Sequence, residues 1–206
     1  MGIMNNIGVL YEHTGAIAIG SVQGDSYFKD GASSGSDLHH FGGSFTEFAV
    51  WDRAISGAQR VVVENALAVK YGVTLSEFNV AVTHLSNTSG FDNDITGIGQ
   101  VAGVNRFVDS EAGGLGLNTP TGLDDGEFIF VGNNGASQSA TDASDIPGGT
   151  ISRFSRTWML TQNDTIVSTN IDIDLSAVGP LSANDLRILV DTDDDGFFAD
   201  ESPLST

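Results

Sequence analysis

The sequence predicts an all-β fold, a β-sandwich with one substantial helix. Hydrophobic residues make up 40% of the 206-residue chain, enough to build a core. Short apolar stretches alternate with clusters of Gly, Asn, Asp and Ser, and the chain has 26 glycines. Many short strands joined by tight turns produce this texture. The run Ser168–Leu175 alternates polar and apolar residues, as expected for a strand with one solvated face.

The predicted strands follow these short apolar stretches. In residues 45–51 the large apolar side chains alternate with polar ones only part of the way, so this strand is expected to be covered on both faces. A polar run at 133–149 predicts a long surface loop. The predicted strands are Ile7–Tyr11, Ala16–Val22, Thr46–Trp51, Asn79–Thr83, Gly126–Gly132, Arg153–Thr161, Ile166–Asp174 and Leu186–Asp191.

One segment has helical rather than strand periodicity. Ser56 and Gln59 fit a capping box, in which each side chain satisfies a backbone N–H of the first turn. Apolar residues then recur at helical spacing up to Tyr71, and Gly72 stands where a C-cap glycine belongs. The sequence therefore predicts a helix over residues 57–71 with its apolar stripe on a sheet.

The charge is strongly negative and unevenly distributed. The net charge is −19, of which residues 1–80 contribute −4 and residues 81–206 contribute −15. This field repels phosphate backbones, so nucleic acids are not expected as partners, and it attracts cations. There are no cysteines, which excludes disulfides and thiolate sites. No apolar run approaches the ~20 residues that cross a bilayer, so membrane insertion is not expected.

The composition shifts after Gly72, which predicts a domain boundary near residues 73–80. Residues 1–77 form the first segment, ending in the helix, and residues 78–206 form the second. The N-terminus lacks the basic and apolar regions of a signal peptide, so for an exported protein this sequence is expected to be a fragment.

The first segment contains a recurring motif. Residues 43–56, Gly-Ser-Phe-Thr-Glu-Phe-Ala-Val-Trp-Asp-Arg-Ala-Ile-Ser, followed by Lys70-Tyr71-Gly72, resemble the end of a laminin-G-like or concanavalin-like jelly-roll domain of bacterial surface proteins. Such a jelly roll needs well over a hundred residues, and about 40 precede the motif. Either the chain is truncated, or a neighbouring molecule supplies the missing strands.

The second segment resembles an uncharacterised β-rich module that often follows this jelly roll in large exported bacterial proteins. The resemblance covers residues 78–202 and is carried by the motifs at 91–99, 128–135, 153–158 and 189–196. It implies a β-sandwich at the bacterial cell surface, outside the cell, and it brings no catalytic residues.

The strongest chemical motif lies near the C-terminus. Asp191, Asp193 and Asp195 occupy positions 1, 3 and 5 of a loop with Gly196 at position 6, a spacing that wraps a chain around calcium. The backbone carbonyl of Phe197 is a further candidate ligand. Position 12 is Ser202 rather than the glutamate of an EF-hand, so Asp200 or Glu201 is expected to close the shell. The alternative is an acidic surface turn without metal.

Weaker candidates include a second metal site at Asp92, Asn93 and Asp94, which is less expected because Asx-rich turns are commoner than metal sites. Trp51 and Trp158 are expected in the core. Glu47 and Asp52 are an odd number of residues apart, so on one strand they would point to opposite faces and could not act as a glycosidase pair. No nucleophile, phosphate-binding or zinc-protease motif is present, so an enzyme is not expected.

These observations predict a non-catalytic, extracellular structural or adhesive module stabilised by calcium. Two alternatives remain open: a carbohydrate-binding module, and a filament subunit that self-associates by strand exchange. The expected partners are accordingly a glycan, a surface protein or further copies of the chain.

Overall fold

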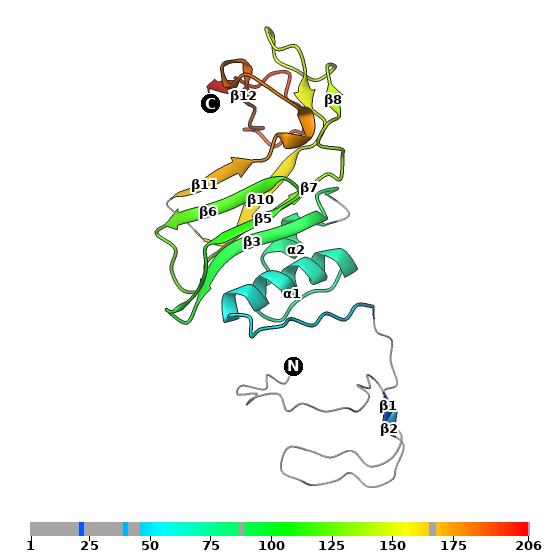
Figure 1. Ribbon diagram of the computed structural model, residues 1–206, viewed down its shortest axis with the longest axis vertical. Helices are drawn as coiled ribbons and strands as arrows, with labels where there is room; N and C mark the ends of the chain where they lie inside the picture. The colour runs from blue at the N-terminus through cyan, green and yellow to red at the C-terminus, as the bar shows by residue number, and fades with distance from the viewer. Residues whose placement is uncertain (1–20, 23–38, 41–45, 87–88, 165–167, 206) are drawn as a thin grey trace. The chain divides into compact units, whose positions relative to one another are not determined.

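The computed structural model describes residues 21–22, 39–40, 46–86, 89–164 and 168–205 (Figure 1). The chain divides into two compact units, Met1–Val50 and Trp51–Thr206. In the first unit, β1 (Ser21–Val22) pairs antiparallel with β2 (His39–His40). The predicted strand Ile7–Tyr11 lies outside the described residues, as does most of Ala16–Val22.

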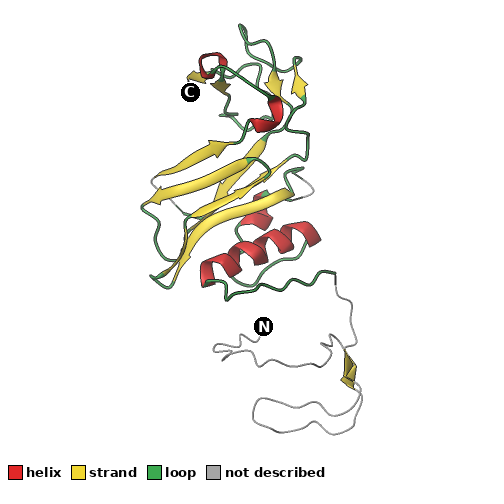
Figure 2. Ribbon diagram, in the orientation of Figure 1, coloured by secondary structure: helices red, strands yellow, loops and turns green. Residues whose placement is uncertain are grey.

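The second unit is rich in β-structure, as the sequence predicts, with few helices (Figure 2). Its helices are α1 (Gly57–Tyr71), α2 (Ala81–His84), η1 (Ser176–Val178) and η2 (Ala183–Asp185). Its strands are β3 (Asn93–Val101), β4 (Asn105–Phe107), β5 (Asp109–Ala112), β6 (Leu115–Thr121), β7 (Phe128–Asn133), β8 (Thr141–Asp142), β9 (Arg153–Phe154), β10 (Trp158–Gln162), β11 (Ser168–Ile173), β12 (Arg187–Ile188) and β13 (Leu204–Ser205).

Two antiparallel sheets form the body of this unit. The four-stranded sheet has the order β10-β7-β3-β4, and the three-stranded sheet has the order β11-β6-β5. Two-stranded ladders join β8 to β9 and β12 to β13. Apolar residues of both sheets, including Leu117 of β6 and Val131 of β7, meet in one buried cluster. The two sheets therefore pack on each other.

Strand β7 is buried on both faces and organises the layers. Phe128 and Phe130 belong to a cluster with the apolar residues of α1 and α2, whereas Ile129 and Val131 belong to the cluster between the sheets. Because neighbouring residues of a strand point to opposite faces, β7 carries the helices on one side and the second sheet on the other. The continuous apolar run of this strand reflects that double burial.

Helix α1 confirms the sequence prediction at both ends. Ser56 Oγ accepts from the Gln59 N–H and Gln59 Oε1 accepts from the Ser56 N–H, which is the capping box. Gly72 closes the helix in the left-handed region, at φ 62°. The helix packs on β3 and β4 of the second unit. By these contacts it belongs with the sheets that follow it, although the composition shift comes after it in the sequence.

The predicted strand Asn79–Thr83 is wrong, because residues 81–84 form helix α2. The fully buried amide of Asn65, on α1, determines the conformation here. Its Oδ1 accepts from the N–H groups of Val80 (3.1 Å) and Ala81 (3.0 Å), and its Nδ2 donates to the Phe78 carbonyl (2.8 Å). These bonds occupy backbone groups that a strand ladder would need.

The prediction for residues 46–51 is also wrong. These residues form neither helix nor strand, and Phe48, Val50 and Trp51 are 61%, 78% and 44% exposed. Trp51 is thus not a core residue, while Trp158 is half-buried against the cluster between the sheets. The predicted strand Arg153–Thr161 is interrupted after Phe154 and resumes at Trp158.

Candidate functional site

The acidic loop, residues 191–201, lies between β12 and β13. These two short strands pair antiparallel, with Arg187 opposite Ser205 and Ile188 opposite Leu204. The pairing brings the two ends of the loop together, although β12 and β13 each contain only two residues. The fold of the loop therefore depends on contacts made by its own side chains.

Asp191 accepts three of these hydrogen bonds. Its Oδ1 accepts from the N–H groups of Asp194 (2.7 Å) and Asp195 (3.3 Å), and its Oδ2 accepts from the Gly196 N–H (2.9 Å). Asp194 and Gly196 adopt positive φ angles of 60° and 83°, which curl the backbone around this carboxylate. Gly196 is the position where the sequence motif requires a glycine.

The curled backbone brings three carboxylates together. One carboxylate oxygen from each of Asp191, Asp193 and Asp195 lies within 4.8 Å of the others, and this is the one such acidic or histidine cluster in the described part of the chain. Asp191 is half-buried and the other two are exposed. An all-oxygen set of this kind suits a hard cation such as Ca²⁺.

The close approach of these carboxylates raises the pKa of Asp193 above its usual value. The largest cause is repulsion from Asp195, followed by loss of solvent, and then by repulsion from Asp200, Asp191 and Glu201. The cluster is thus a place where negative charge is unfavourable unless a proton or a cation compensates it.

The predicted closing residues lie near the cluster. Glu201 folds back on the start of the loop, where it accepts from the Thr192 N–H (2.6 Å) and from the Thr192 hydroxyl (3.1 and 3.0 Å). Asp200 is close enough to raise the pKa of Asp193. The Phe197 N–H donates to Asp195 (2.8 Å), and its side chain is 62% exposed.

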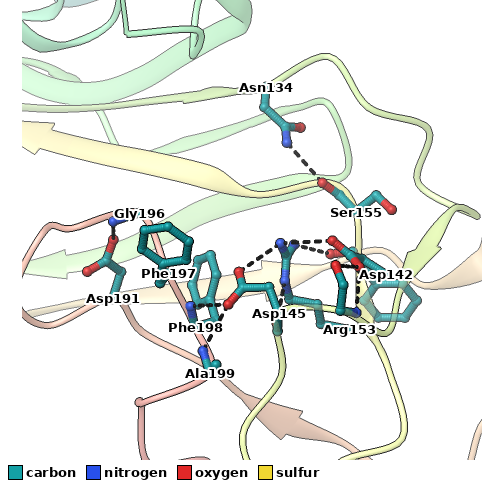
Figure 3. A network of polar contacts seen from close by, with 12 residues as sticks. Asn134, Asp142, Asp145, Arg153, Ser155, Asp191, Gly196, Phe197, Phe198 and Ala199 are labelled. Atoms are coloured by element: carbon teal, nitrogen blue, oxygen red, sulfur yellow. Dashed lines mark hydrogen bonds and ion pairs between the residues drawn. The ribbon is translucent and has the colours of Figure 1, made fainter.

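A second network, not predicted from the sequence, attaches the loop to the rest of the unit (Figure 3). Asp145 Oδ1 accepts from the backbone N–H groups of Phe198 (2.8 Å) and Ala199 (3.0 Å). Arg153 Nη2 lies 3.1 Å from Asp145 Oδ2 and 3.3 Å from Asp142 Oδ2. The Arg153 guanidinium also stacks over the Phe198 ring, 4.9 Å from its centroid.

This network connects distant segments, so no local pattern could have revealed it. The one signal in the sequence is the scarcity of basic residues, eight in all, which makes each arginine notable. Hydrogen bonds from Ser144, with a smaller contribution from the charge of Arg153, hold the pKa of Asp142 below its usual value. Asp142 and Asp145 both anchor Arg153 through ion pairs.

The structure gives the residues of the weaker metal candidate a different role. Asp94 Oδ2 accepts from Asn133 Nδ2 (2.9 Å) and lies 3.5 Å from Arg156 Nη1. Asn93 donates to the Asn133 carbonyl (3.2 Å) and, at 3.4 Å, to Asp92. These contacts join the start of β3 to the end of β7. A guanidinium beside Asp94 also opposes the binding of a second cation there.

Trp51 lines a surface pocket of about 260 Å³ beside helix α1. Arg53 and Gln59 contribute polar groups to it, while Val62 and Ile95 contribute apolar ones. An exposed indole beside polar side chains is chemistry suited to a sugar ring or a small polar ligand.

No described helix is long and apolar enough to span a membrane.

Residues 113–205 match the model of a domain of unknown function, DUF8202. The matched region begins at the turn before β6 and extends through the acidic loop to β13, and it omits β3 and both α-helices. No curated protein and no solved structure matches the chain.

Proposed function

We propose that the chain is a non-catalytic structural or adhesive module of a bacterial surface protein, stabilised outside the cell by calcium bound in the acidic loop. The observation that carries the proposal is the convergence of Asp191, Asp193 and Asp195, whose carboxylate oxygens lie within 4.8 Å of one another. Their positions in the sequence, 1, 3 and 5 before a glycine, are those of calcium loops.

Asp191, Asp193 and Asp195 would hold the ion, with Glu201 and Asp200 as the nearest further carboxylates. A bound cation would remove the repulsion that raises the pKa of Asp193. The loop is attached to the β8–β9 ladder through Asp145, so ordering the loop would also stabilise that region. The role of the ion is mechanical, and no chemical step is assigned to it.

The surface location rests on the sequence. The likeness of residues 43–72 to the end of a jelly roll of bacterial surface proteins supports it, as does the likeness of residues 78–202 to a module of exported proteins. A net charge of −19 suits a protein that stays soluble in a salty, calcium-rich medium. Protease treatment of intact producing cells tests the location: an intracellular protein would resist digestion until the cells are lysed.

Calcium binding is tested by thermal unfolding of protein first stripped with EDTA. At a calcium concentration 100-fold above Kd, binding stabilises the native state by about 2.7 kcal/mol, which raises Tm by roughly 5–10 °C in a unit of this size. Isothermal titration gives the stoichiometry, and magnesium at the same concentration tests selectivity.

Asp193→Asn should abolish most of the calcium-induced shift. Asp109→Asn, an exposed carboxylate on β5 outside the loop, is the matched control and should retain it. If the melting temperature were the same in EDTA and in millimolar calcium, the proposal that calcium stabilises the module would be wrong.

A carbohydrate-binding module is the second candidate, favoured by the exposed indole of Trp51 in its pocket. Glycan-array binding that is lost in Trp51→Ala, with an unchanged melting temperature, would support it. Phe197→Ala, which removes an exposed aromatic outside the pocket, is the control. An array without hits would leave the structural module as the assignment.

A further inference from the structure

The two sheets end, on one side, in the edge strands β10 and β11. β10 pairs only with β7, and β11 pairs only with β6, among the strands described. β7 and β6 face each other across the buried cluster that contains Val131 and Leu117. β3 and β5, the neighbours of β7 and β6 on their other sides, are also in contact with each other. β10 and β11 are therefore the outer strands on the same side of the packed sheets.

The strand register shows which side chains of these edges point inward. Leu160 of β10 lies opposite Val131, while Ile171 and Ile173 of β11 lie opposite Leu117 and Leu115. Residues directly opposite each other on neighbouring strands point to the same face. All three edge residues thus point to the inner face, where their partners are at most 3% exposed.

Yet the edge residues are not covered. Leu160, Ile171 and Ile173 are 41%, 48% and 39% exposed. These three residues, with the edge of β11 that pairs with no described strand, form the acceptor edge. A core-facing apolar surface beside an unpaired strand edge is where an additional strand can bind, because it gains both backbone hydrogen bonds and apolar contacts.

The chain also contains a segment with the properties of such a strand. Residues 46–51 form no helix or strand, and Phe48 and Val50, two positions apart, are 61% and 78% exposed. In an extended conformation these two side chains would point to one face. The segment has six residues, as many as β11.

We propose that residues 46–51 of one copy bind as an added strand along β11 of a second copy, with Phe48 and Val50 covering Ile171 and Ile173. Within one chain, Trp51 at the end of the segment lines the pocket beside α1. That helix covers the face of the four-stranded sheet opposite to the one that faces the second sheet. Donor and acceptor lie at different places on the chain, so the contact repeats head to tail and builds open chains.

The electrostatics of the contact permit this association. The side chains on the inner face of the contact are uncharged, whereas Glu47 of the added strand and Asp172 of β11 lie on its outer face and repel each other, as do the −19 charges of the two copies. Such repulsion is screened by salt, so association should strengthen as ionic strength rises. The proposal does not depend on calcium or on the proposed function.

Because the chain has no cysteine, disulfide trapping reports this contact without background. The double variants Val50→Cys/Ile171→Cys and Val50→Cys/Ile173→Cys test the two registers that keep the apolar residues on one face. After mild oxidation, one of them should form a ladder of dimers, trimers and higher species on non-reducing gels. Mixing the matching single variants should give a heterodimer faster than either homodimer.

Val50→Cys/Ile151→Cys is the matched control, since Ile151 is 90% exposed and outside the acceptor edge. A ladder no stronger in the acceptor-edge variants than in this control would overturn the proposal. Light scattering provides an independent measurement on the unmodified chain: its mass should rise with concentration and with salt. Phe48→Asp and Ile171→Asp should each weaken association at least about tenfold, and Val104→Asp should not.

Both aspartate variants should keep the melting temperature of the parent, because the residues they replace are at least 48% exposed. A synthetic peptide of residues 46–53 should bind the monomer and shorten the chains. A parent protein that stays monomeric at all concentrations and salt levels would contradict the inference, as would association unaffected by either aspartate substitution.

Discussion

Replacing Asn65 by alanine tests the amide that joins helix α1 to the start of α2. Asn65 is fully buried, and its side chain donates to the carbonyls of Val61 and Phe78 and accepts from the N–H groups of Val80 and Ala81. The Val80 N–H has a second acceptor, the Phe78 carbonyl, at 2.9 Å. The full desolvation penalty in Asn65→Ala therefore falls on the Ala81 N–H.

An unsatisfied buried N–H costs about 1–3 kcal/mol, and each of the other lost bonds contributes about 0.5–1 kcal/mol. The higher helix propensity of alanine returns about 0.6 kcal/mol. We expect the free energy of unfolding to fall by about 3 kcal/mol, and Tm to fall by roughly 6–12 °C. Urea unfolding followed by circular dichroism measures this change.

Glu64→Ala, on the same helix, is the control. It removes the ion pair with Arg60 (2.6 Å) and should cost about 0.5 kcal/mol. If Asn65→Ala were no more destabilising than Glu64→Ala, the amide would not be holding α2 in place, and the explanation for the missing strand at residues 79–83 would fail.

Two further predictions concern the sheet and the acidic loop. A Cβ at Gly99 of β3 would overlap the ring of Phe128, so Gly99→Ala should lower the free energy of unfolding by about 3 kcal/mol, as measured by urea unfolding. Adding Phe128→Leu to the same chain should recover part of that loss. If the effects of the two substitutions were strictly additive, the steric reasoning would be contradicted. In EDTA, the pKa of Asp193 is higher in the folded protein than in the unfolded chain, so the protonated carboxyl stabilises the folded state relative to the ionised one. This stabilisation is lost as the pH rises from 3.8 through the folded-state pKa. The Tm of Asp193→Asn minus that of the parent should therefore rise across this range and then level off, and in calcium the sign should reverse; a difference independent of pH would refute the repulsion.

Local sequence patterns were sufficient where a structure depends on neighbouring residues. The helix over residues 57–71 is confirmed because its capping box and its C-cap glycine act within one turn of each end. Strand β7 is confirmed because an apolar run between glycine-rich turns is typical of a strand buried on both faces. The curl of the acidic loop is likewise local, since Asp191 binds backbone groups three to five residues ahead.

The predictions that failed concern segments whose conformation depends on distant partners. Nothing within residues 79–83 indicates that Asn65 occupies their N–H groups. The segment 46–51 has the composition of a buried strand, but no described strand pairs with it, and Phe48, Val50 and Trp51 are exposed. Strand β3 was not predicted because its glycines at 97 and 99, which admit Phe130 and Phe128, resemble turn residues.

By itself the sequence determined the class of the fold, the helix over residues 57–71 and the acidic cluster, because composition, capping and loop chemistry act over a few residues. Only the tertiary structure decided which strands pair, which edges stay open and how the loop is attached to Arg153 through Asp145. The physical reason is that pairing and burial join residues tens of positions apart, and their free energy depends on a geometry that no short stretch of sequence contains.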